Sequence, residues 1–162
     1  MPKTIMVSLT TESVNEAIKE LRRYKRWVQD KERELRIRLA QIGATVASIQ
    51  FARAIYNGTN DITVRVDNTK SVAVIYAKGK SVAFIEFGSG AKYGYGHPQA
   101  GEFGTGPGTY PEGKGHWDDP KGWYYAPGQH SFGNPPAMAM YNAVQEMTEQ
   151  LTQIAKEVFS KA

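Results

Sequence analysis

Residues 61–67 read DITVRVD, and apolar and polar side chains alternate strictly along this stretch. Successive side chains of a β-strand point to opposite faces, so the alternation predicts a half-buried strand. Its inward face would carry Ile62, Val64 and Val66. One face of this strand is therefore expected to pack against a hydrophobic core.

The residues that follow predict two more strands. Asp67-Asn68 favours a turn, and residues 71–77 are apolar and rich in β-branched side chains. Residues 78–80 favour a tight turn into a third strand over residues 82–87. We therefore expect a small antiparallel β-sheet of three to four strands, with a helix covering one face.

A helical pattern precedes the strands. Apolar residues recur there at the 3-4 spacing of one helix face: Val14, Ile18, Leu21, Val28, Leu35, Leu39, Ile42, Val46 and Ile49. Residues 10–13 can cap the helix start, and Asn57-Gly58 is a helix stop signal. Because Lys25 and Glu32 interrupt the apolar face, the sequence predicts either one long kinked amphipathic helix or two helices that meet within residues 24–31.

The same helix carries charges of both signs. Its basic residues are Lys19, Arg22, Arg23, Lys25, Arg26, Lys31, Arg33, Arg36 and Arg38. Its acidic residues are Glu16, Glu20, Asp30, Glu32 and Glu34. Ion pairs at i,i+4 favour a solvent-exposed helix, and the formal net charge of +4 is small. A surface that faces DNA or a partner is the alternative, but a nucleic-acid binder usually has few acids among its bases.

A second amphipathic helix closes the chain. Asn134 can cap it, and Pro135 suits the first helical position, where a missing N–H costs nothing. A 4-3 stripe then predicts a packing face: Met140, Val144, Met147, Leu151, Ile154 and Val158. The fold class is therefore α+β, a single domain of residues 1–162.

Residues 88–133 are rich in glycine, proline and aromatic side chains. A loop of this length inside a small domain is usually functional, and its aromatic content argues against disorder. We expect an ordered excursion that contacts a neighbouring subunit or partner. The candidate contact residues are Glu86, Phe87, Gly88, Tyr93, Tyr95, Trp117, Trp123, Tyr124 and Tyr125. The alternative is that the aromatic side chains only fold the loop back on its own domain.

The histidines and glycines of this loop predict neither a metal site nor a nucleotide site. His97, His116 and His130 include no short His-x-His or His-x-x-x-His pair to anchor a metal. The glycines at residues 88–96 are not followed by a helix, which a phosphate-binding loop requires. We expect no metal and no cofactor, and glycines that allow positive φ and close backbone approach.

Glu86 stands at the end of the predicted third strand. A catalytic carboxylate pair needs a second acid at a defined separation, and the candidates Glu102, Asp118 and Asp119 all lie in the loop. We expect Glu86 instead to cap backbone amides at the strand–loop corner or to pair with a cation. On this interpretation the chain is not an enzyme.

Composition restricts the cellular setting. The chain has no cysteine, which excludes disulfides and thiol chemistry. We find no run of some 18 apolar residues that would cross a membrane, and no apolar core of a secretory signal near the N-terminus. Synthesis in a reducing cytoplasm fits these features.

Two segments resemble the tail-completion (neck) family of tailed bacterial viruses. Residues 82–90, VAFIEFGSG, are similar to the family signature of an apolar strand that ends in Glu, an aromatic residue, Gly, and Thr or Ser. Residues 134–143, NPPAMAMYNA, are similar to its Pro-rich start of a C-terminal helix. The order of elements agrees as well. Two differences are the segment at residues 57–62, where many members carry a Pro-x-x-Thr-Gly-x-Leu type of sequence, and the longer, more aromatic loop after Gly90.

The resemblance implies a structural protein of the virion, made in the bacterial cytoplasm. It would form a homo-oligomeric, six-fold ring between the head-side connector and the tail tube or tail terminator, with DNA passing through the ring and no membrane contact. Two other functions stay open on the residues alone. One is a cell-wall-degrading hydrolase that uses Glu86 and a loop aspartate, and the other is a nucleic-acid-binding protein that uses the basic helix at residues 19–38.

Overall fold

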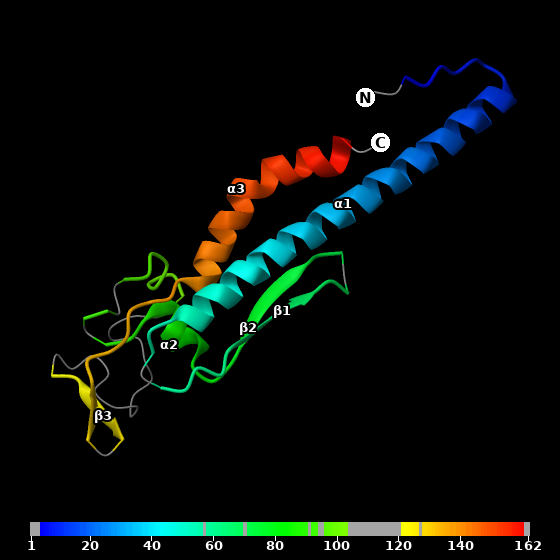
Figure 1. The fold of residues 1–162 in the computed structure, drawn as a ribbon. Coiled ribbons are helices and arrows are strands. Elements are labelled where there is room, and N and C mark those ends of the chain that lie inside the picture. The colour runs from blue at the N-terminus through cyan, green and yellow to red at the C-terminus, as the bar shows by residue number, and fades with distance from the viewer. Residues whose placement is uncertain are drawn as a thin grey trace.

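A computed structural model describes residues 4–56, 58–69, 71–90, 92–93, 96–103, 121–126 and 128–160. These residues have an α+β fold, as expected, with two long helices side by side and two β-hairpins (Figure 1). The elements are α1 (Thr11–Arg53), β1 (Thr63–Asp67), β2 (Val74–Lys78), α2 (Val82–Phe87), β3 (Trp123–Ala126), β4 (Gln129–Ser131) and α3 (Ala139–Ser160).

The N-terminal helical pattern forms one helix, α1, and not a pair of helices. Its 43 residues make it about 65 Å long at 1.5 Å per residue. Thr10 caps its start, since the side-chain hydroxyl accepts a hydrogen bond from the Ser13 amide at 3.3 Å. The helix ends at Arg53, before the predicted stop signal, and the Asn60 side chain donates to the Phe51 carbonyl at 2.8 Å.

Helix α3 runs antiparallel to α1 along part of its length. Its first turns pack with Ala47 and Phe51 in the buried core, to which Ala139, Ala143 and Ile85 also belong. Near its other end, the Phe159 ring meets the Trp27 ring edge-on, with centroids 5.9 Å apart. Since α3 ends at Ser160, the part of α1 before Trp27 projects beyond it by about 24 Å (Figure 1).

The predicted packing stripe of α3 is only partly correct. Ile154 and Val158 are buried, but Val144 and Leu151 are 52% and 43% exposed. Ala139 and Ala143 take the buried positions in their place. Small side chains let the two helices approach closely at the core, and this turns the larger neighbours outward.

The first predicted hairpin forms as expected, but the expected third strand is wrong. β1 and β2 pair antiparallel from Thr63↔Lys78 to Asp67↔Val74, and the alternating burial of β1 follows the sequence pattern. Residues 82–87 form the short helix α2 instead of a strand. A short apolar run without alternation fits a buried helix as well as a strand. The described residues thus contain two separate two-stranded sheets, β1–β2 and β3–β4, rather than one sheet of three to four strands.

Candidate functional site at the start of α3

Glu86 caps the first turn of α3 from outside that helix. Both carboxylate oxygens lie 3.0 Å from the Met140 amide nitrogen, and Oε1 also accepts from the Tyr141 amide at 3.0 Å. The first amides of a helix have no partner within it, and its N-terminus favours negative charge. Glu86 is only 4% exposed, so the predicted amide cap is confirmed, although it lies at the start of α3 and not at a strand–loop corner.

This cap explains why α3 begins later than predicted. Pro135 is not at the first helical position, because α3 begins at Ala139. Asn134 forms an isolated antiparallel bridge with Ser89, with amide-to-carbonyl bonds of 2.9 and 3.1 Å, instead of capping the helix. The acceptor for the helix amides therefore comes from α2, more than forty residues earlier in the chain.

Further backbone contacts join the two segments, residues 85–90 and 132–138. The Ala137 amide donates to the Ile85 carbonyl at 2.8 Å. Gly90 and Gly133 have φ of +82° and +104°, and a side chain on Gly133 would overlap the Ser89 carbonyl oxygen. The expected role of glycine in close backbone approach is confirmed at this crossing. We call this unit, residues 85–90 with 132–141, the junction.

His97 is the buried neighbour of Glu86 that the sequence pattern did not connect with it. Its Nδ1 accepts a hydrogen bond from the Gln99 amide at 3.0 Å, and its Nε2 lies 3.4 Å from Glu86 Oε1. That distance suits an ion pair when the imidazole is protonated, but the atoms lack hydrogen-bond geometry. The ring packs edge-on against Phe87 and Tyr141, at centroid distances of 4.5 and 5.5 Å.

The junction commits Glu86 to helix capping. Two backbone amides make three contacts with its two oxygens. The candidate second acid Glu102 accepts from the Gln99 side chain at 3.4 Å, and Asp118 and Asp119 lie outside the described residues. Among the described residues, no group of three His, Asp or Glu side chains is placed to hold a metal ion.

The predicted contact residues whose side chains the structure describes lie in separate places. Glu86, Phe87 and Gly88 belong to the junction, where they are buried or half-buried. Tyr124, on the β3–β4 hairpin, is 74% exposed, and its ring lies 4.6 Å from the His130 ring. His130 in turn contacts the exposed Phe132 ring at 4.5 Å.

The structure describes the side chain of only one of the other predicted contact residues, Tyr93. Tyr93 is half-buried, with the Lys92 ammonium 5.1 Å from its ring centroid. Tyr95 and Trp117 lie outside the described residues. Trp123 and Tyr125 belong to β3, where the structure describes the backbone but not these two side chains. The exposed aromatic side chains described in this region are therefore Tyr124 and Phe132, which both contact His130, and Phe103, which is 59% exposed beside Phe87.

A second exposed surface lies on the projecting part of α1. The sequence analysis did not predict it. Ile18 and Leu21 are 40% and 56% exposed, and Val14 and Tyr24 are similarly open. These residues continue the apolar pattern that is half-buried or buried farther along the helix. We call Val14, Ile18, Leu21 and Tyr24 the apolar stripe. The apolar side chains at residues 14–24 were the available signal in the sequence, although Lys25 interrupts the pattern after them.

Comparisons with protein-family models, curated proteins and solved structures find no match for this chain. Among the helices in the described ranges, none combines the length and the apolar character needed to cross a membrane.

Proposed function

We propose that this chain is a structural subunit of the neck of a tailed bacterial virus, where an oligomeric ring of it joins the head-side connector to the tail. The observation that supports this most is the junction. The two segments that resemble the tail-completion family, residues 82–90 and 134–143, lie far apart in the sequence yet form one unit through the Glu86 cap and the Ser89–Asn134 bridge.

The shape of the molecule also supports a ring subunit. The apolar stripe lies near one end of the elongated molecule, and the β3–β4 hairpin with exposed Tyr124 and Phe132 lies at the other (Figure 1). Two different surfaces on one chain allow head-to-tail contacts, which close into a ring when the rotation between copies fits.

The apolar stripe gives such a contact a driving force. Full burial of an aliphatic side chain is worth about 1.5–3 kcal/mol relative to exposure. Val14, Ile18 and Leu21 each keep about two fifths or more of their surface in water. A second copy that packs on the stripe would recover part of this energy.

The test of the neck role is genetic. A virus whose gene for this chain is interrupted is expected to accumulate filled heads and separate tails, and the intact chain supplied in trans is expected to restore joined particles. The chain should also be present in purified virions. Normal joining without the chain would contradict the proposal. Release of soluble fragments from purified cell wall by the chain alone would favour the hydrolase instead.

A further inference from the structure

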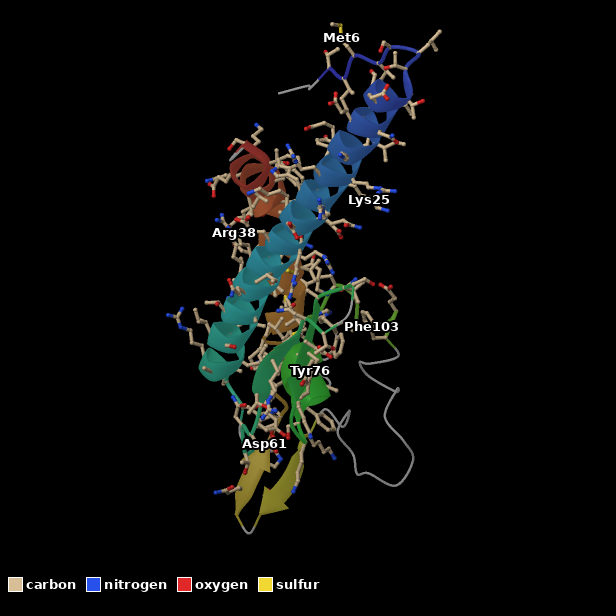
Figure 2. The ribbon with its side chains drawn as sticks, turned by 90° about the vertical axis from the view of Figure 1, so that its right-hand side faces the viewer. Met6, Lys25, Arg38, Asp61, Tyr76 and Phe103 are labelled. Atoms are coloured by element: carbon tan, nitrogen blue, oxygen red, sulfur yellow. The ribbon has the colours of Figure 1, made fainter. Side chains whose placement is uncertain are left out.

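Helix α1 carries a line of positive charge that begins on its projecting part, beside the apolar stripe, and extends to Arg33. Lys19, Arg22, Arg26 and Arg33 are all exposed, and their 3-4-7 spacing places them on one side of the helix. We call these four residues the basic ridge. The ridge is about 21 Å long at 1.5 Å per residue. Figure 2 shows Lys25, next to the ridge, directed away from α1.

The structure separates charges that are mixed in the sequence. Glu20 pairs with Arg23 at 3.0 Å, and Glu32 lies 3.2 Å from Arg36. Glu34 contacts both Lys31 and Arg38, at 3.4 and 3.1 Å. Glu20, Glu32 and Glu34 therefore pair with basic residues outside the ridge. In the described part of the chain, no carboxylate lies within ion-pair distance of a ridge side chain.

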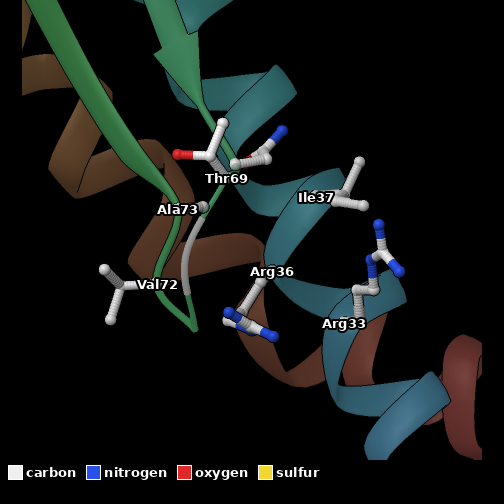
Figure 3. Close-up of a pocket in the computed structure, with 7 residues that line it drawn as sticks. Arg33, Arg36, Ile37, Thr69, Val72 and Ala73 are labelled. Carbon is white, nitrogen blue, oxygen red and sulfur yellow. The ribbon is translucent and has the colours of Figure 1, made fainter.

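The ends of the ridge provide two open basic sites. Around its first half, five side chains line one open hollow: Lys19, Arg22, Arg23, Lys25 and Arg26. At its other end, Arg33 and Arg36, the latter paired with Glu32, line a pocket of about 300 Å³ against the turn between β1 and β2 (Figure 3). Between Lys19 and Arg33, the one acid in the row of the ridge is the exposed Asp30, which lies between Arg26 and Arg33.

We propose that the basic ridge binds the phosphate backbone of duplex DNA without reading its sequence. Phosphates of one strand follow each other at about 3.4 Å along the duplex axis, so a ridge of this length can reach several of them. Guanidinium groups suit phosphate because they offer paired donors in one plane. The four ridge side chains are long and cationic, and such side chains contact phosphates but give no base specificity by themselves.

A rod-shaped partner fits this face better than a flat anionic membrane. Glu12 and Glu16 are exposed beside or before the ridge, and the exposed Asp30 lies in its row between Arg26 and Arg33. A flat surface that reached the ridge would approach all three carboxylates and would be repelled by them. A duplex contacts a narrow line along the ridge and of the three meets only Asp30.

The inference adds a partner to the proposed neck function but rests on the charges of α1 alone. Ring assembly uses the apolar stripe, so duplex binding by the purified chain can fail while assembly succeeds, and the reverse. The two proposals are therefore tested separately.

The test measures binding of a fluorescently labelled duplex by anisotropy over a range of salt concentrations. Four phosphate contacts predict that log K falls with log[salt] at a slope of about −4. Arg22→Gln/Arg26→Gln should reduce that slope by about two and weaken binding by a factor of about 60 at about 0.1 M salt. The result should not depend on the duplex sequence.

The matched control is Arg65→Gln/Lys78→Gln, which removes two exposed cations of the β1–β2 hairpin and the same total charge. This variant should bind within about twofold of the wild type. Equal weakening by both pairs would overturn the proposal, since binding would then follow net charge alone. Binding to phosphatidylglycerol vesicles but not to duplex would also overturn it. Helix content by circular dichroism should be unchanged in both variants, because the substituted side chains are exposed.

Discussion

The junction buries its main polar and apolar groups, whereas the projecting part of α1 exposes them to water. In the junction, Glu86 is buried and its carboxylate accepts amide bonds, while Ile85 beside it is 1% exposed. On the projecting helix, Ile18 and Leu21 face water and the basic ridge has no described acidic partner. The first region satisfies its groups within the chain and so specifies the fold. The second leaves its apolar side chains and its cations facing water, free to contact another molecule.

The largest expected difference in stability comes from removing one apolar side chain from the core part of α1 and one from its projecting part. Phe51→Ala opens a cavity in the core and should lower the free energy of unfolding by about 3–5 kcal/mol. Leu21→Ala should change it by less than about 0.5 kcal/mol, because that side chain is largely exposed in the monomer. Urea unfolding of both variants at low protein concentration makes the measurement. Similar losses would show that the projecting part is packed in the monomer.

A second test uses two glycines with positive φ. Gly133→Ala adds a Cβ that would overlap the Ser89 carbonyl oxygen, so the crossing must separate, and we expect a loss of about 3 kcal/mol or more. Gly128→Ala is the control, because its φ is +74° but a Cβ there meets nothing within 4 Å. The control should show only the cost of the left-handed backbone, about 1–2 kcal/mol. Equal losses in urea unfolding would mean that backbone approach at the junction contributes nothing.

Two substitutions of Glu86 separate the contributions of its charge and of its hydrogen bonds to the stability of the fold. Glu86→Ala removes the acceptor for the Met140 and Tyr141 amides and should cost about 2–3 kcal/mol of unfolding free energy. Glu86→Gln keeps one acceptor oxygen and should cost less, because it loses the charge at the helix N-terminus, worth about 0.3–1 kcal/mol, but not every bond. A Glu86→Ala variant as stable as the wild type would contradict the capping role.

The smallest expected effect concerns the turn after β1. Hydrogen bonds from the Thr69 hydroxyl and the Thr69 amide hold the pKa of Asp67 below its usual value. A lowered pKa in the folded state stabilises the fold above the pKa of the unfolded chain, and this contribution is lost as pH falls through the folded pKa. Thr69→Ala should raise the pKa of Asp67 toward its usual value, because only the amide bond remains. An NMR titration of the Asp67 carboxyl measures this, and an unchanged pKa would contradict it.

Periodicity predicted the parts of the fold that rest on local pattern. The 3-4 spacing of α1 and the alternation of residues 61–67 survive in the structure. The sequence pattern gave wrong predictions where tertiary contacts determine the secondary structure. The apolar run 82–87 fits strand or helix, and the start of α3 depends on Glu86 rather than on the nearby Asn134.

In the candidate site, too, some features follow from the local sequence and others depend on tertiary contacts. Glu86 as an amide cap could be predicted from its place between apolar residues, but its contact with His97 depends on how the loop folds back. The assembly surface was expected in the aromatic loop. The apolar stripe became visible only when the structure showed that α3 ends beside Trp27.

The measurement that tests the assembly surface most directly is the solution mass by light scattering over a range of concentrations. We expect the wild-type mass to rise from one copy, 18.0 kDa, toward a closed ring. Ile18→Ser/Leu21→Ser should stay at one copy. The control Val144→Ser/Leu151→Ser, equally exposed on α3, should assemble like the wild type. A wild-type chain that remains a single copy at every concentration, or an Ile18/Leu21 variant that assembles as well as the control, would contradict the account.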